Sequence, residues 1–173
     1  MKPRGLLMIE HRLIERMISI IQHELDRIRD ASRVDTVFML IYADRTHHGK
    51  EEDILFRALR EKDMNSRDKQ LMNELTDEHQ RARELTAGLV EANEKYCAGR
   101  IENLEIIAQN LNELLDLYPG HIRKEDSEFF PNAEKYFNEQ ELSAMLTEFY
   151  DFDMHMIHEK YRKVIEEQEK VYV

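Results

Sequence analysis

The sequence has few of the residues that support strands, tight turns or disulfides. It contains five glycines, three prolines, one cysteine and no tryptophan in 173 residues. Leu, Ile, Met, Glu, Lys and Arg are abundant instead, a composition that favours long helices joined by short connections. The single cysteine, Cys97, excludes both an intramolecular disulfide and a zinc site of paired cysteines. We therefore expect an all-α protein of a reducing compartment, the cytoplasm.

Long apolar runs and excess positive charge are missing as well. No stretch of about 18 apolar residues occurs, which predicts no membrane-spanning helix, and the N-terminus reaches Glu10 and Arg12 before any apolar stretch of signal-peptide length. The formal net charge of −11 would repel nucleic acid and anionic lipid. We expect a soluble protein that binds neither. The length suits one domain over residues 1–173.

Apolar residues recur at three- and four-residue steps in four segments, as they do on one face of a helix. We predict helices over about 7–28, 35–59, 66–96 and 101–118. Pro119-Gly120 predicts a kink or break after the fourth helix, and Pro131 another boundary. Asn138 and Glu141 form a capping-box signature for a last helix that reaches about position 170. The pattern predicts four core helices and one appended at the C-terminus.

Residues 47–56 recur in similar form as residues 121–130. Each unit opens with a histidine, carries Lys and Glu three and four residues later, and ends on Phe. A Glu-His pair lies upstream of each unit: Glu10-His11 before the first and Glu78-His79 before the second. The chain therefore reads as two helical hairpins, each offering a His and then a His-x3-Glu pair.

This repeated arrangement predicts a metal site. A His and a Glu four residues apart lie on the same face of a helix, so both side chains can reach one ion. Imidazole and carboxylate together suit iron, manganese or zinc, and carboxylates can bridge two ions in the core of a bundle. Burying these groups would be costly unless they were paired or metal-bound. The predicted ligands are His11, His47, Glu51, His79, His121 and Glu125.

Some neighbouring residues offer an alternative register. His48 and Glu52 form a second His-x3-Glu pair, turned by about 100 degrees from the first, and Asp126 gives the second unit a His-x4-Asp pair. Either register can bind a metal ion. We prefer the six residues above because they keep the apolar phase and match across the repeat. By phase alone, His155 and His158 fall on the solvent side of the last helix.

The motifs resemble those of the hemerythrin-like (HHE cation-binding) family, especially its bacterial cytoplasmic members. The motifs are Ile9-Glu10-His11, His47-His48-Gly49-Lys50-Glu51-Glu52, Glu78-His79 and His121-Ile122-Arg123-Lys124-Glu125-Asp126. The resemblance implies an up-down four-helix bundle. It also implies two non-haem iron ions, bridged by carboxylates and an oxo or hydroxo group. The family's ligand roles fall on the six residues predicted above.

One departure from the family pattern concerns a nitrogen ligand. An oxygen-carrying hemerythrin has a His-x3-His pair on its third helix, whereas Arg83 follows His79 at that spacing here. The segment from Ile157 to Tyr161 looks like the tail of longer bacterial members. His158 can replace the missing nitrogen if the last helix is broken near residues 151–153, so we include His158 among the candidate ligands. Arg83 is then expected to pair with a carboxylate or an iron-bound anion.

The resemblance implies a protein that binds or senses dioxygen, or a related small oxidant, and favours a metal- and oxygen-binding protein over a dedicated enzyme. Two alternatives share the same donors. One is a protein of nitric oxide or peroxide stress that repairs iron centres or reduces peroxide, and the other is an iron-sensing or iron-storage module. A fifth nitrogen ligand would bring the site close to that of an oxygen carrier, and its absence would leave a more open, reactive site.

Overall fold

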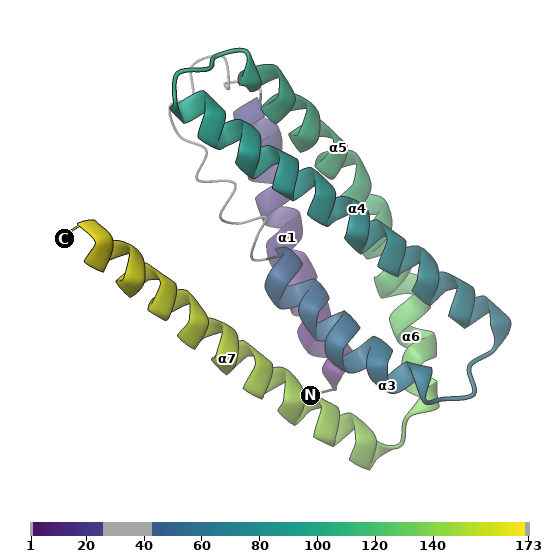
Figure 1. Cartoon of the computed structure of the whole chain (residues 1–173). Coiled ribbons are helices and arrows are strands. Elements are labelled where there is room, and N and C mark those ends of the chain that lie inside the picture. The colour runs from purple at the N-terminus through teal and green to yellow at the C-terminus, as the bar shows by residue number, and fades with distance from the viewer. Residues whose placement is uncertain (1, 26–42, 172–173) are drawn as a thin grey trace.

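The protein is all-α. The computed structural model describes the backbone of residues 2–25 and 43–171, with side chains for 2–22 and 43–156. Every regular element in the described part is helical (Figure 1). The α-helices are α1 (Pro3–Leu25), α3 (Arg57–Arg60), α4 (Ser66–Cys97), α5 (Asn103–Lys124), α6 (Phe130–Ala133) and α7 (Glu139–Val171). The described residues contain no helix of the length and apolar character needed to cross a membrane.

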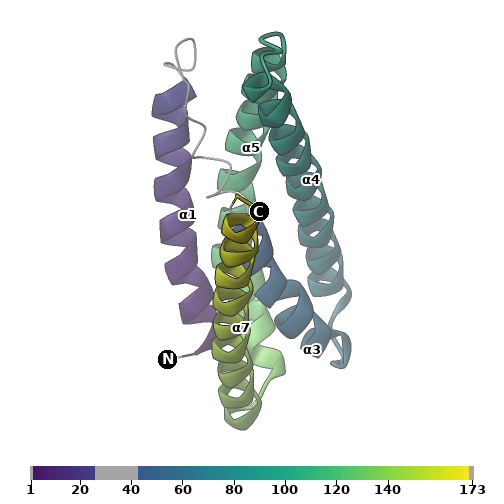
Figure 2. The ribbon, with the colours of Figure 1, turned by 60° about the vertical axis from the view of Figure 1, so that its left-hand side comes forward.

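Four helical segments form the bundle and a fifth lies outside it. Helices α4 and α5 form a long hairpin that lies beside α1, and residues 43–60 supply the fourth segment (Figures 1 and 2). The long helix α7 contacts α1 and the segment of residues 51–56. This arrangement confirms the predicted bundle with an appended C-terminal helix. Residues 26–42, where the second helix was expected to start, lie outside the described residues.

Three segments have the wider turn of a π-helix, and each contains one of the predicted metal ligands His47, Glu51 and Glu125. They are η2 (Ala43–His48), η3 (Glu51–Phe56) and η4 (Glu125–Phe129). π-helical turns are rare and occur often at functional sites. Because a π-helix has more residues per turn than an α-helix, consecutive residues are separated by a smaller angle around the axis, and neighbours can share the inner face. His47 and His48 are both buried, with 1% of their surface exposed.

Helix α5 runs through Pro119 and Gly120, so the predicted break is wrong. Both residues are exposed, whereas Tyr118, His121 and Ile122 around them are buried. The proline ring therefore faces solvent and removes one helical hydrogen bond at the surface. The buried neighbours hold the helix on its inner side.

The second expected boundary, at Pro131, coincides with the change from the π segment η4 to α6. Pro131 lies in the first turn of α6, where a missing N–H is tolerated. A short 3-10 turn, η5 (Glu134–Tyr136), follows α6. The capping box is confirmed: the backbone N–H of Glu141 donates to Asn138 Oδ1, and that of Asn138 donates to Glu141 Oε2, both at 2.9 Å.

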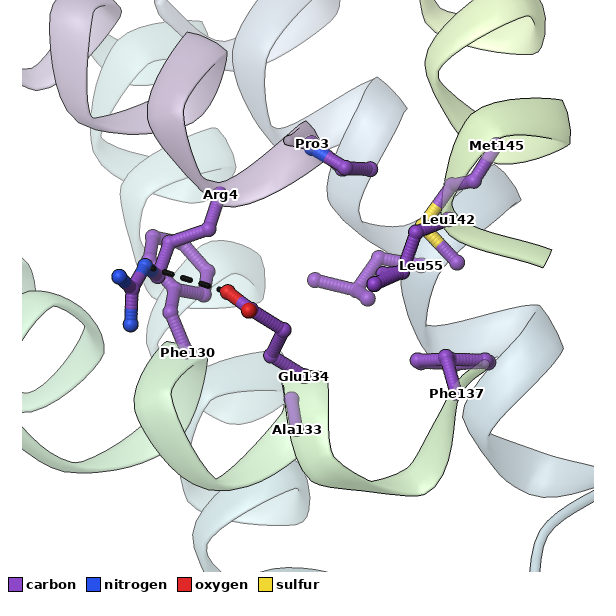
Figure 3. A pocket seen from close by; sticks show the side chains of 9 residues that line it. All are labelled: Pro3, Arg4, Leu55, Phe130, Ala133, Glu134, Phe137, Leu142 and Met145. Carbon is purple, nitrogen blue, oxygen red and sulfur yellow. Dashed lines mark ion pairs between the residues drawn. The ribbon is translucent and has the colours of Figure 1, made fainter. Parts of the chain in front are cut away.

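The N-terminal half of α7 packs into the core of the bundle. Leu142, Met145 and Phe149 are buried there together with Leu55 and Phe130. Figure 3 shows the small pocket beside them, whose rim carries an ion pair between Arg4 Nε and Glu134 Oε2 at 3.4 Å. Its volume of about 20 Å³ is close to that of one water molecule. The pocket is therefore a small gap in the packing between α7 and the bundle rather than a ligand site.

Candidate metal centre

The structure buries all six predicted ligands in the bundle. They come from α1, from the two π segments of the second helical stretch, from α4, and from the junction of α5 with η4. None has more than 3% of its surface exposed. The fold thus brings together the residues His11, His47, Glu51, His79, His121 and Glu125.

These residues, with His48, form two groups that share a carboxylate. In each group, one potential ligand atom from every residue lies within 4.8 Å of the others. We call them the three-histidine group and the two-histidine group. The three-histidine group is His48, Glu51, His79 and His121, and the two-histidine group is His11, His47, Glu51 and Glu125.

Glu51 lies between the two groups and turns one oxygen toward each. Its Oε1 is 3.5 Å from His47 Nε2, and its Oε2 is 3.3 Å from His79 Nε2. A carboxylate so placed has the geometry of a bridge between two ions.

Glu125 is placed in the same way from the opposite hairpin. Its Oε2 is 3.0 Å from His11 Nε2. Its Oε1 is 3.3 Å from His121 Nε2 and 3.7 Å from His79 Nε2. Two ligands bound to one ion at about 2.1 Å and at right angles lie about 3 Å apart, so these distances suit donors that share a metal ion.

The atoms that face the centre have no hydrogen-bond partner among the described residues. They are the Nε2 atoms of all five histidines and both oxygens of Glu51 and of Glu125. Buried polar atoms are nearly always paired, and so many unpaired atoms in one place indicate that a cation completes the site. Nitrogen and carboxylate donors in this mixture fit iron, manganese or zinc.

A second layer of carboxylates holds each histidine from behind. Every imidazole offers its Nδ1 to an acidic side chain, which fixes the ring and leaves Nε2 free for a metal ion. The pairs are His11 with Asp126 (2.7 Å), His47 with Glu10 (2.8 Å), His48 with Asp44 (3.3 Å), His79 with Glu52 (2.7 Å) and His121 with Glu78 (2.9 Å).

This layer explains the residues of the alternative register. Glu52 and Asp126 lie behind His79 and His11 and outside both groups. His48 lies inside the three-histidine group, although our preferred register passed over it. The adjacent histidines at 47 and 48 were the available signal, but an α-helical period separates them by 100 degrees, whereas the π segment η2 separates them by less and buries both.

Cations in turn neutralise the outer carboxylates. Arg12 pairs with Asp126, Lys50 with Glu10 and Lys124 with Glu78. Arg83 pairs with Glu52 at 2.5 Å and with Asp44 at 3.1 Å. The expectation that Arg83 pairs with a carboxylate is confirmed.

The comparison with protein families agrees with this geometry. The model of the hemerythrin HHE cation-binding domain matches residues 3–133, more than half of the chain. The chain belongs to the hemerythrin family. Comparisons with curated proteins and with solved structures gave no match. The hemerythrin match ends at Ala133, so α7 lies beyond it.

In this hemerythrin domain, His48 adds a fifth imidazole to the two groups of potential ligands. Helix α7 is continuous through residues 151–153, so the break that would have turned His158 inward is absent. The side chain of His158 lies outside the described residues, while His155 is exposed as predicted. The fifth imidazole at the centre therefore comes from the second helical segment, three residues before the start of η3.

The electrostatics of the hemerythrin site keep the outer carboxylates ionised. Burial by itself would raise the pKa of Glu10, Glu52 and Glu78, but the imidazole and the cation bound to each carboxylate outweigh burial and lower its pKa. Three ionised carboxylates thus hold the histidines by hydrogen bonds, and each carboxylate is balanced by its own cation.

Two histidines of the three-histidine group differ in their protonation. Burial lowers the pKa of His121, but Glu125 and Glu78 raise it by more, so that the pKa lies at about 9. Burial and the neighbouring imidazoles, His79 first among them, hold the pKa of His48 well below its usual range. At neutral pH His48 is ready to bind a metal ion, whereas His121 must first lose a proton.

Proposed function

We propose that the protein holds two non-haem iron ions, one in each histidine group, and binds or senses dioxygen or a related small oxidant. The observation that carries this proposal is that Glu51 and Glu125 each offer one oxygen to each group. The proposed ligands are His11, His47, His48, Glu51, His79, His121 and Glu125. The part of His158 stays a prediction.

Because the two groups offer different numbers of nitrogen atoms, we propose different roles for them. The three-histidine group offers three nitrogens besides the carboxylate oxygens, and the two-histidine group offers two. An ion with six positions therefore keeps more of them free in the two-histidine group, where we place the binding of the small ligand. A pair of iron ions can supply two electrons to an oxidant and take them back.

Aromatic side chains keep water from the two groups. Phe130 stacks on His11 with ring centroids 5.6 Å apart, and Phe56 stacks on His79 at 5.8 Å. Both phenylalanines are fully buried. They give the centre an apolar wall, which suits a small, uncharged ligand such as dioxygen. The single exposed cysteine, Cys97, suits a reducing cytoplasm, where we expect the protein to act.

Five nitrogen donors favour the binding of dioxygen over the two alternatives. Proteins of nitric oxide or peroxide stress were expected to use a more open site with four histidines. His48 brings the count to five without any contribution from α7. We therefore propose a metal site that is nearly saturated with protein ligands and keeps one coordination position for the small ligand.

Metal analysis and absorption spectroscopy test the proposal. The purified protein should contain two irons per chain, and its visible spectrum should gain a band on exposure of the reduced form to air and lose it on deoxygenation. Irreversible oxidation or bleaching would contradict oxygen binding and favour the stress-response alternative. Less than one iron per chain would exclude the dinuclear centre.

A further inference from the structure

The two halves of the site also differ in the burial of one lysine. In the second half, Lys124 pairs with Glu78, which holds His121, and 31% of the lysine side chain is exposed. In the first half, Lys50 pairs with Glu10, which holds His47, but Lys50 is fully buried. The repeat in the sequence does not account for this difference.

The difference comes from α7. Lys50 Nζ donates a second hydrogen bond, to Asp153 Oδ1 of α7, at 2.6 Å. The neighbouring Phe152 covers Gly49 so closely that a Cβ at Gly49 would lie 2.7 Å from the Phe152 ring. Helix α7 thus closes the two-histidine half of the centre and leaves the corresponding lysine of the other half partly exposed.

A chain of hydrogen bonds joins α7 to a proposed ligand. It runs from Asp153 through Lys50 and Glu10 to His47 Nδ1. Carboxylates behind a metal-bound histidine set its orientation and basicity. The charge that Lys50 shares with Asp153 decides how much negative charge Glu10 presents to His47. A residue outside the family domain therefore acts on the two-histidine group.

We propose that α7 is a functional part of the metal centre, in which Asp153 positions His47 through Lys50 and Glu10 and couples the docking of α7 to the state of the two-histidine iron. This rests on the proposed function. The coupling acts in both directions: metal in this group stabilises the docked helix, and release of the helix alters the group.

Amide hydrogen exchange over residues 145–156 tests the coupling. In the wild-type protein, iron loading should slow exchange there by about fivefold or more. Asp153→Asn should remove most of that protection and shift the reduction potential upward, because the site loses a negative charge. Asp153→Glu should restore both. Asp151→Asn, an exposed neighbour on the same helix, should behave as wild type.

A second variant tests the docking of α7 without a substitution at position 153, so that local misfolding at that position does not affect the result. Phe152→Ala uncovers Gly49 without changing a charge, so it should loosen α7 and reduce the protection that iron gives to residues 145–156. Iron per chain is measured on every sample. Normal iron content with exchange that iron does not alter would overturn the coupling alone, as would an Asp153→Asn protein identical to Asp151→Asn. Wild-type protein without iron would overturn the proposed function, and the coupling with it.

Discussion

At the scale of single residues, much of the site can be predicted from the sequence. The buried phase and the repeat indicate His11, His47, His79 and His121, and the structure places all four at the centre. His48 was passed over because its inward turn depends on the π segment, which no spacing rule reveals. The partners of the Nδ1 atoms come from other helices, so only the three-dimensional fold brings them together.

His48 supplies the fifth nitrogen, and its removal should weaken the three-histidine group. We expect His48→Ala to lower the iron content from two per chain toward one, because the group loses one of its three nitrogen donors. His155→Ala, at an exposed position, is the control. The comparison is made by metal analysis after dialysis. A His48→Ala protein that keeps both irons with wild-type affinity would remove His48 from the ligand set.

Metal binding should release protons at neutral pH. The pKa of His121 lies at about 9 in the folded protein, against about 6.5 when unfolded. Without metal, protonated His121 stabilises the fold fully below pH 6.5, and this contribution is lost as the pH rises through 9. A metal ion competes with that proton, so its affinity should rise with pH up to about 9.

Calorimetry can count those protons. Titration of ferrous iron in buffers with different heats of ionisation should show proton release at pH 7, and less of it at about pH 10. The absence of proton release at pH 7 would show that the histidines are already neutral.

At the scale of helices, periodicity predicts most of the fold. The third and last helices, α4 and α7, and the capping box at Asn138 agree with the structure. The break at Pro119 was wrong because local sequence rules do not register that Tyr118 and His121 are held by tertiary packing. The π segments were missed for a related reason: they depend on tertiary packing around the site rather than on the helix propensity of their residues.

Pro119 should therefore be a local weakness of α5. Replacement by alanine restores a helical N–H on an exposed face, and we expect it to raise the free energy of unfolding by about 1–2 kcal/mol. Chemical denaturation of the metal-free protein gives the measurement. Pro131→Ala, in the first turn of α6, should change stability little. Lower stability of Pro119→Ala would mean that the proline fixes a conformation the helix needs.

At the scale of the whole molecule, the metal centre divides the core. One apolar cluster lies around Phe56, Phe129 and Phe149, and the other around Leu89, Leu111 and Tyr118. The unpaired buried atoms of the two groups link segments from both hairpins. A protein with net charge −11 would be stabilised further by cations bound at its centre. Metal binding should therefore stabilise the bundle as a unit.

Removal of the metal should lower the melting temperature. At free iron about 100 times the dissociation constant, each site adds about 2.7 kcal/mol to the free energy of unfolding. Thermal unfolding followed by circular dichroism, with and without a chelator, should show one transition that falls on chelation and recovers when iron returns. An unchanged transition would indicate that the bundle is stable without the ions.

The central claim is that two irons share Glu51 and Glu125, and magnetic measurement of the oxidised protein tests it most directly. Two ferric ions joined through carboxylates are coupled, so Mössbauer spectra at low temperature should show quadrupole doublets without magnetic splitting. Electron paramagnetic resonance should show almost no ferric signal from a protein that contains two irons per chain. An isolated high-spin ferric signal that accounts for all the iron would contradict the shared centre.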